Sequence, residues 1–210
     1  MLKSTFFKLK IVYNIIDLDV LNMNTLFIST YSYLITIGLI KNDKTLAIKK
    51  VESIKSHSKY LIPTIDSILK ENNLELSNIN EIVVIIGPGS FTGVRLGVIV
   101  AKTLAYSLKI KIKTITSIEA LAVSNDVLER KIVTVSDNKG VYYAFFENNE
   151  PKTEIKYLSK TEFENIKSKD IIINDNVLNL EKITIYLKNK AFTNSHEVKP
   201  IYIKEIEALK

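Results

Sequence analysis

A cluster of glycines is the feature that most constrains how this chain can fold. The sequence contains six glycines, and four of them lie within residues 87–97, which read GPGSFTGVRLG. Glycine admits positive φ angles and the close approach of another backbone, so its concentration in a glycine-poor chain marks a place that needs such geometry. Residues 81–86, Glu81 followed by five apolar residues, come directly before it and suit a central strand buried on both faces. We therefore predict a strand, a tight turn and a helix over 93–108.

The glycine-rich segment does not match three familiar functional turns. A Walker A loop needs Lys and then Ser or Thr after its last glycine, whereas Val94 and Arg95 follow Gly93. The dinucleotide fingerprint needs a third glycine where Thr92 stands. The Gly-x-Ser-x-Gly pattern of a nucleophile elbow is missing as well. The turn is therefore expected to be structural or to contact an anion through its free N–H groups. Its residues are Gly87, Pro88, Gly89, Ser90, Phe91, Thr92 and Gly93.

The order of the predicted elements indicates a duplicated α/β fold. Period-2 and period-3.6 apolar patterns give three strands, a helix and a strand in the first half, and the same series in the second half. Two halves that repeat this unusual order predict the two-lobed, ribonuclease H-like fold of the actin-like ATPases, with lobes at 23–124 and 125–210. The predicted strands are 24–30, 33–40, 44–50, 81–86, 111–115, 131–136, 141–147, 153–158 and 170–174, and the predicted helices are 56–72, 93–108, a short one from Ser117, 161–167 and 176–190.

Composition limits the kinds of site that the chain can build. Without cysteine it can form neither disulfides nor thiolate metal sites, which fits a reducing cytosol. His57 and His196 are its two histidines, too few for a histidine metal cluster. The net charge of +6 comes almost entirely from scattered lysines, so we assign it to composition and not to a directed nucleic-acid patch.

Residues 1–22 differ from the rest of the chain. Lys3, Lys8 and Lys10 interrupt the apolar run, so the segment lacks the continuous core of a signal peptide. Met23 stands directly before the first convincing strand. We expect 1–22 to be an extension or a start assigned too far upstream. We expect no membrane segment, because no stretch reaches the roughly 18 uninterrupted apolar residues that a span requires.

The helix predicted over 93–108 carries a small residue at every fourth position, namely Gly93, Gly97, Ala101 and Ala105. Such a ridge lets another helix approach closely. Each glycine inside a helix costs about 1 kcal/mol relative to alanine, so the pair indicates required proximity to another element. Two interpretations remain open. The ridge packs inside its own lobe, as buried helix faces commonly do, or it faces a partner protein.

Taken together, these residues resemble the TsaB (YeaZ) family. The segment at 87–97 is similar to the family signature, and shorter matches extend the likeness from Met23 to the end of the chain. The resemblance is strongest over 56–122 and weak over 148–195. The further matching segments are His57-Ser58 with Leu61 and Pro63, the run 117–122, Asp137 with Val141-Tyr142, and Pro200-Ile201-Tyr202.

The resemblance implies a cytoplasmic subunit that performs no chemistry itself. The family is paralogous to TsaD, the metal-bearing subunit that transfers a threonylcarbamoyl group to the adenosine beside the tRNA anticodon, and TsaB-like proteins pair with TsaD through helices of the first lobe. A TsaE-like ATPase is a further expected partner, and tRNA is met indirectly through the complex. The resemblance implies no metal or cofactor of its own, and leaves open a nucleotide at the shared interface and a homodimer in the partner's absence. The expected interface residues are Leu61, Ile65, Gly93, Arg95, Leu96, Gly97, Val100, Ala101 and Leu104.

Two departures from the family pattern bear on alternative functions. Ser29 stands where the family has an aspartate, in the strand where actin-like ATPases hold Mg-nucleotide, so independent Mg-ATP binding is not expected. Asn138-Lys139 replace Ala-Arg after Asp137. One alternative is an actin-fold ATPase or phosphotransferase that uses the Gly-rich turn for phosphate and Asp137 for Mg²⁺. The other is a tRNA-binding module, although the dispersed tyrosines predict no stacking platform.

Overall fold

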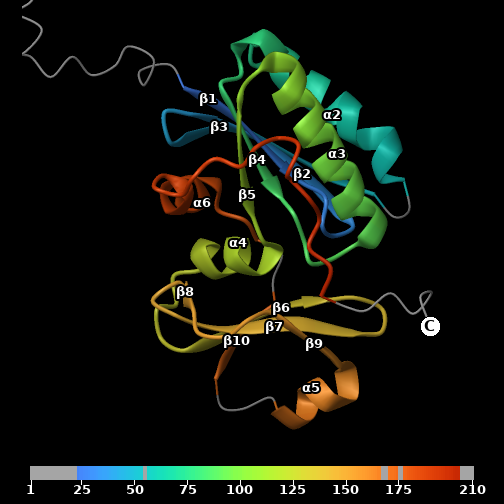
Figure 1. The fold of residues 1–210 in the computed structure, drawn as a ribbon, viewed down its shortest axis with the longest axis vertical. Helices are drawn as coiled ribbons and strands as arrows, with labels where there is room; N and C mark the ends of the chain where they lie inside the picture. Colours follow the sequence, from blue (N-terminus) through green and yellow to red (C-terminus); the bar gives the residue numbers. More distant parts are fainter. Residues whose placement is uncertain (1–22, 54–55, 167–169, 175–176, 204–210) are drawn as a thin grey trace, which may run out of the picture.

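The computed structural model describes residues 23–53, 56–166, 170–174 and 177–203. The expectation for residues 1–22 lies outside this part of the chain. The described residues form two α/β lobes, each built on its own sheet (Figure 1). The fold is that of the actin-like, ribonuclease H-like proteins, as predicted.

The first lobe is a five-stranded sheet in the order β3-β2-β1-β4-β5. Its first three strands are antiparallel, whereas β4 and β5 run parallel to β1. Helices α2 and α3 lie side by side on one face of this sheet, and α4 follows β5 (Figure 1). The bounds are β1 Asn24–Ser29, β2 Leu34–Lys41, β3 Lys44–Glu52, α2 His57–Glu71, η1 Leu76–Asn78, β4 Glu81–Ile85, α3 Phe91–Leu108, β5 Lys111–Ile115 and α4 Ser117–Ser124.

The second lobe repeats the core of this order. Strands β9, β7, β6 and β10 lie next to one another as β3, β2, β1 and β4 do in the first lobe, with β10 parallel to β6. A two-residue strand, β8, is an addition that the sequence did not predict, and the third strand begins at Lys156, three residues after its predicted start. The bounds are β6 Lys131–Ser136, β7 Gly140–Glu147, β8 Glu150–Pro151, β9 Lys156–Ser159, α5 Lys160–Ile166, β10 Ile171–Ile173 and α6 Leu180–Leu187.

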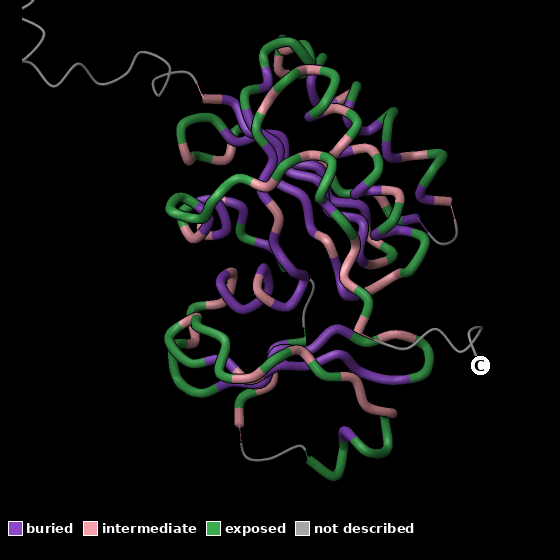
Figure 2. The backbone as a smooth tube through the Cα atoms, in the orientation of Figure 1, coloured by how far each residue is buried: buried purple, intermediate pink, exposed green. Residues whose placement is uncertain are grey.

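One continuous apolar core joins the two lobes. It includes the wholly buried strands β1 and β4, the inward side of α3, and residues of α4, α6 and the inner face of β6 and β7. Figure 2 shows this buried core running through the first sheet and into α4. A smaller cluster on the outer face of the second sheet is covered by α5, through Phe163. Strand β3 alternates between exposed and partly buried residues, as suits the edge of a sheet.

The last described segment returns to the first lobe, which the repeated order of elements did not predict. Leu180 of α6 packs against Gly38 of β2, and Glu181 accepts the Thr45 N–H at 3.0 Å. Further along, Thr193 forms a bridge with Ile112, and the Ile201 N–H donates to the Ile86 carbonyl at 2.9 Å. Residues 180–203 therefore complete the first lobe, although they follow most of the second lobe in the chain.

Helix α4 begins with a capping box, as the three-residue spacing of Thr116 and Glu119 in the sequence indicates. The Thr116 hydroxyl accepts the Glu119 N–H at 3.0 Å, and the Glu119 carboxylate accepts the Thr116 N–H at 3.1 Å. Glu119 also accepts hydrogen bonds from the Tyr186 hydroxyl at 3.2 Å and from Lys190 at 3.0 Å. The Glu119 carboxylate therefore caps α4 and also connects it by hydrogen bonds to α6 and to the segment that follows α6.

We expect the free energy of unfolding of the Glu119→Gln variant to fall less at acidic pH than that of the unchanged protein. Burial alone would raise the pKa of this carboxyl, but the hydrogen bonds from Thr116 and Lys190 outweigh burial and hold its pKa below the usual 4.5. The unfolded chain therefore takes up the proton first, and stability falls as the pH drops from 4.5 through the lowered pKa of the folded protein. Urea unfolding at pH 7 and at several pH values below 4.5 should show a shallower fall for the variant. The exposed Glu197→Gln variant is the control, and an equal change in both would contradict this role.

Candidate functional site

The Gly-rich turn is held tightly between the β1–β2 connection and the start of α4. Gly87 and Gly89 have φ angles of +97° and +154°, and the Gly87–Pro88 peptide is cis. A Cβ at Gly89 would lie 2.2 Å from the Tyr31 carbonyl oxygen, so this position requires glycine for both its conformation and its space. The Ser117 N–H donates to the Gly87 carbonyl at 2.8 Å, which fixes the other side of the turn to α4.

The turn's N–H groups are partly occupied by the chain itself. Ser90 caps α3, since its side chain accepts the Gly93 N–H at 3.2 Å, and its own N–H donates to the Tyr31 carbonyl at 2.7 Å. Helix α3 therefore begins at Phe91, two residues before its predicted start. With these two amides engaged, the turn resembles a packed junction between β1, β4 and α3 more than an open phosphate cradle.

The structure corrects the predicted direction of the small-residue ridge. Gly93, Gly97, Ala101 and Ala105 are buried on the inner side of α3. A Cβ at Gly97 would lie 2.2 Å from the Thr30 hydroxyl oxygen, which itself donates to the Gly93 carbonyl at 2.8 Å. The ridge therefore lets α3 approach the end of β1, and the packing within its own lobe is the correct interpretation.

The prediction of direct partner contact is accordingly wrong for Gly93, Gly97 and Ala101. It is wrong for Leu61 and Ile65 too, because α2 buries both side chains in the core. Hydrophobic periodicity groups these residues correctly on one face of each helix, but that face points to the sheet. For the four remaining residues, partner contact stays a prediction: Arg95 is exposed, and Leu96, Val100 and Leu104 are half-buried along α3.

The outer sides of α2 and α3 carry several exposed apolar side chains. Ile62 of α2 is 51% exposed, and Ile99 and Tyr106 of α3 are 58% and 62% exposed. Leu96 and Val100 are half-buried beside them. Helix α3 is also long and apolar enough to cross a membrane by length and composition alone, a property that core helices of soluble proteins share. Its buried side packs against β1, β4 and β5.

Arg95 joins α3 to the segment that returns from the second lobe. Its Nε donates to the Tyr202 hydroxyl at 2.7 Å, and its guanidinium lies 3.6 Å from the centroid of the Phe91 ring. The Phe91 and Tyr202 rings are 5.9 Å apart. The sequence indicated Arg95 as a site residue but gave no sign that Tyr202, 107 positions away, lies beside it.

Neither Ser29 nor Asp137 is arranged to hold a metal ion. Ser29 is buried at the end of β1, and its hydroxyl has no hydrogen-bond partner. Asp137 instead caps the turn between β6 and β7, where its Oδ1 accepts the N–H groups of Lys139 and Gly140 and the Tyr157 hydroxyl at 2.7–2.9 Å. Within the described ranges, no three His, Asp or Glu side chains come together as a metal site would need.

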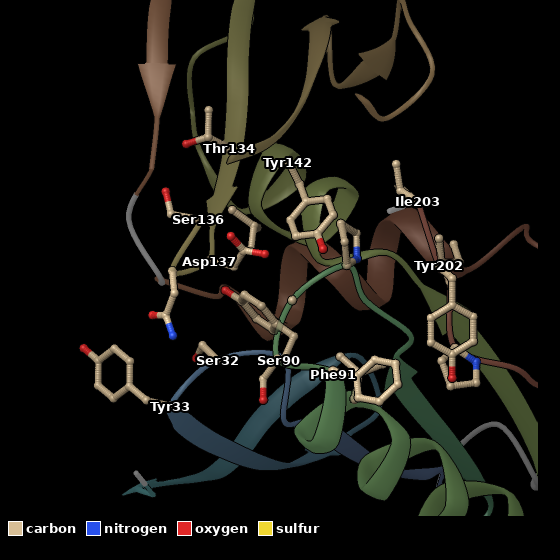
Figure 3. Close-up of a pocket in the computed structure, with 18 of the residues that line it drawn as sticks. Ser32, Tyr33, Ser90, Phe91, Thr134, Ser136, Asp137, Tyr142, Tyr202 and Ile203 are labelled. Carbon is tan, nitrogen blue, oxygen red and sulfur yellow. The ribbon is translucent and has the colours of Figure 1, made fainter. Parts of the chain in front are cut away.

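A cleft of about 900 Å³ lies between the lobes (Figure 3). The connection from β1 to β2 and the Gly-rich turn form its wall in the first lobe. The ends of β6 and β7 form the wall in the second lobe, and residues 200–203 lie at its side. The sequence did not predict which side chains would meet here, because they come from stretches that lie far apart in the chain.

The sequence of the chain is similar to proteins of known family. A family model described as TsaD, tRNA N6-adenosine threonylcarbamoyltransferase, matches residues 51–195. The tRNA threonylcarbamoyladenosine biosynthesis protein TsaB of Bacillus subtilis (strain 168) is 37% identical over 115 residues, which cover 55% of this chain and 50% of that protein. The protein of the same name from Buchnera aphidicola subsp. Baizongia pistaciae is 31% identical over 157 residues, covering 70% of this chain and 66% of that protein.

These alignments span half to two-thirds of the length of the two curated relatives. Among solved structures, YeaZ from Pseudomonas aeruginosa superposes with a TM-score of 0.72 over 86% of this chain and 99% of that chain. Its sequence identity is 17%, so this likeness concerns the fold. The family model, the curated relatives and the two-lobed fold lead to one conclusion: the chain belongs to the TsaB (YeaZ) family.

Proposed function

We propose that this chain is a non-catalytic subunit that pairs with a TsaD-like threonylcarbamoyltransferase and activates it for N6-threonylcarbamoyladenosine formation on tRNA, at the adenosine beside the anticodon. The observation that carries the proposal is the match of a TsaD family model to residues 51–195 in a chain whose acidic and histidine residues form no metal cluster within the described ranges. The chain would thus share the fold of the enzyme without the groups that hold its metal.

The surface that we propose for pairing is the outer side of α2 and α3. Two proteins with one fold can pair through equivalent surfaces, much as the subunits of a homodimer do. Exposed apolar side chains such as Ile62 and Ile99 lie on this side, where burial by a partner would be favourable. Arg95, Leu96, Val100 and Leu104 would lie within or beside the contact. In the partner's absence, the same side could pair two copies of this chain.

Other components follow from the same proposal. A TsaE-like ATPase would join the complex, and the chain would meet tRNA through it, in the cytoplasm. The chain would contribute no cofactor of its own, and a nucleotide could lie at the shared interface. The phosphotransferase alternative has little support. Two N–H groups of the turn already donate to the Tyr31 carbonyl and the Ser90 hydroxyl, and Asp137 accepts backbone N–H groups in a turn.

Co-expression with the TsaD-like protein from the same organism, tagged on that partner, tests this proposal. We expect a stoichiometric complex that forms threonylcarbamoyladenosine on tRNA, and little product from either protein alone. The proposal fails if the two proteins stay apart at micromolar concentration, or if the TsaD-like protein is fully active without this chain. ATP hydrolysis by this chain alone would favour the phosphotransferase instead.

A further inference from the structure

The two arginines of the chain lie in similar surroundings but differ in one respect. Both are exposed and stack on an aromatic ring, with the guanidinium of Arg95 3.6 Å from the centroid of the Phe91 ring and that of Arg130 4.9 Å from the centroid of the Phe145 ring. Arg130 also has a carboxylate partner, because its Nε lies 3.4 Å from Asp170 Oδ2. Within the described part of the chain, no carboxylate pairs with Arg95. The charge of Arg95 is therefore left for another molecule to match.

The Arg95 guanidinium is held in a fixed orientation. Its Nε donates to the Tyr202 hydroxyl at 2.7 Å, and the rings of Phe91 and Tyr202 lie 3.6 and 5.3 Å from the guanidinium carbon. These contacts leave its two terminal NH₂ groups, from which no described residue accepts a hydrogen bond. The two groups form a planar fork that matches the two oxygens of a carboxylate. Because the side chain is already ordered, binding a carboxylate would cost little further conformational entropy.

The order of Arg95 depends on the last described segment of the chain, residues 196–203, which runs along α3 (Figure 1). Lys102 of α3 donates to the carbonyls of His196 and Val198 at 3.3 and 3.4 Å. The rings of Tyr106 and His196 lie 4.9 Å apart. These contacts bring Tyr202 to the beginning of α3, so a segment that follows the second lobe in the chain positions an arginine of the first.

The neighbours of Arg95 favour a protein partner over a nucleic acid. Ile99 lies one helical turn after Arg95, so both are on the outer side of α3, and Ile99 is 58% exposed. Helix α3 contains no acidic residue, and its other cation, Lys102, already donates to backbone carbonyls. An RNA backbone is bound through several cations, whereas one arginine among apolar and aromatic side chains is typical of the centre of a protein interface. Charge complementarity then requires a carboxylate on the partner.

We propose that Arg95 is the anchor of the pairing surface and binds the carboxylate of an aspartate or glutamate of the TsaD-like partner, with Tyr202 as the residue that positions it. This inference rests on the pairing proposed above and goes further, because apolar contact alone would need neither the charge of Arg95 nor the hydroxyl of Tyr202. Of the two aromatic neighbours and Arg95, only Phe91 and Tyr202 belong to the described lining of the interlobe cleft, so the contact lies outside the cleft.

Titration of the tagged TsaD-like protein with variants of the full chain tests the anchor. We expect Arg95→Met to weaken pairing by about 30-fold, the effect typical of removing one member of a desolvated charge pair. Arg95→Lys should restore only part of the affinity, because lysine lacks the planar fork. Arg130→Met is the matched control, since it makes the same change at the arginine that already has a carboxylate partner, and it should leave the affinity unchanged. Urea unfolding verifies that the variants are folded.

Double-mutant cycles identify the carboxylate and test the role of Tyr202. The exposed aspartates and glutamates of the partner are replaced one at a time by asparagine or glutamine. One replacement should weaken pairing with the unchanged chain and have little further effect on pairing with Arg95→Met. Tyr202→Phe removes only the hydroxyl and should weaken pairing by about fivefold, as the loss of one hydrogen bond does. It should have no effect in the Arg95→Met background, whereas a purely structural role would give the same loss in both.

The outcomes separate this inference from the proposed pairing. If the unchanged chain does not bind the TsaD-like protein, both are wrong. If it binds but Arg95→Met binds as tightly, or no carboxylate of the partner is coupled to Arg95, the pairing stands and the carboxylate anchor is wrong. If Arg95→Met leaves pairing unchanged and instead weakens the binding of tRNA to the complex, Arg95 contacts a phosphate, which also overturns the inference.

Discussion

Replacing Gly93 with alanine is expected to lower the free energy of unfolding by about 3 kcal/mol, a large effect for the addition of one methyl group. The new Cβ would lie 2.2 Å from the Thr30 carbonyl oxygen and close to the Ser90 hydroxyl and His57 Nε2, at 3.0 and 3.1 Å. The Thr30 oxygen belongs to the backbone at the end of a buried strand, so it cannot move without disturbing the sheet. Urea unfolding followed by circular dichroism measures the change.

The sign of the change in unfolding free energy shows whether the steric clash or the helix propensity of alanine dominates. In an unobstructed helix, glycine to alanine stabilises by about 1 kcal/mol. Thr103→Ala, at an exposed position of the same helix, should change stability by less than about 0.5 kcal/mol. A stabilising Gly93→Ala would mean that α3 does not approach the end of β1 as described here.

If α2 and α3 form the proposed pairing surface, replacing Ile99 with aspartate is expected to weaken pairing with the TsaD-like protein by about 100-fold or more. A charge buried in such an interface has to be desolvated without a partner. Ile99 is 58% exposed in this chain, so the change should leave its folding intact. Titration of the variant against the tagged partner, together with its unfolding curve, separates loss of binding from loss of structure. Modification of tRNA by the mixture should fall in parallel.

Ile185→Asp is the matched control for this experiment. Ile185 is 61% exposed and lies on α6, away from the outer side of α2 and α3. It should leave the affinity unchanged. Equal losses for the two variants would point to a general effect of the added charge, and tight pairing by Ile99→Asp would remove this side of α3 from the interface.

Local patterns predicted the part of the fold that surrounds the site. The apolar run before Gly87 became the buried strand β4, and the glycines mark the tight junction with α3. Thr116 and Glu119 formed the capping box that their spacing predicts. Each of these features depends on residues close in sequence, whose geometry is largely set by their own backbone preferences.

Features that depend on distant residues could not be predicted in the same way. The spacing of Gly93 and Gly97 shows that they share a face, but a small-residue face packs equally well against its own sheet or against a partner. Asp137 was a candidate Mg²⁺ ligand, and only the neighbouring N–H groups identify it as a turn cap. The contact of Arg95 with Tyr202 joins residues 107 positions apart and exists only in the folded chain.

The return of residues 180–203 to the first lobe also sets an order of events during synthesis. A ribosome delivers β1 to β5 long before it delivers α6 and the segment that bridges Ile112 and bonds to Ile86. Until then, the nascent first lobe lacks the cover that Leu180 provides over Gly38, and the buried surface there stays open to chaperones or to other chains. The lobe that emerges first is thus among the last to be finished, and a ribosome that stalls within the second lobe leaves both lobes incomplete.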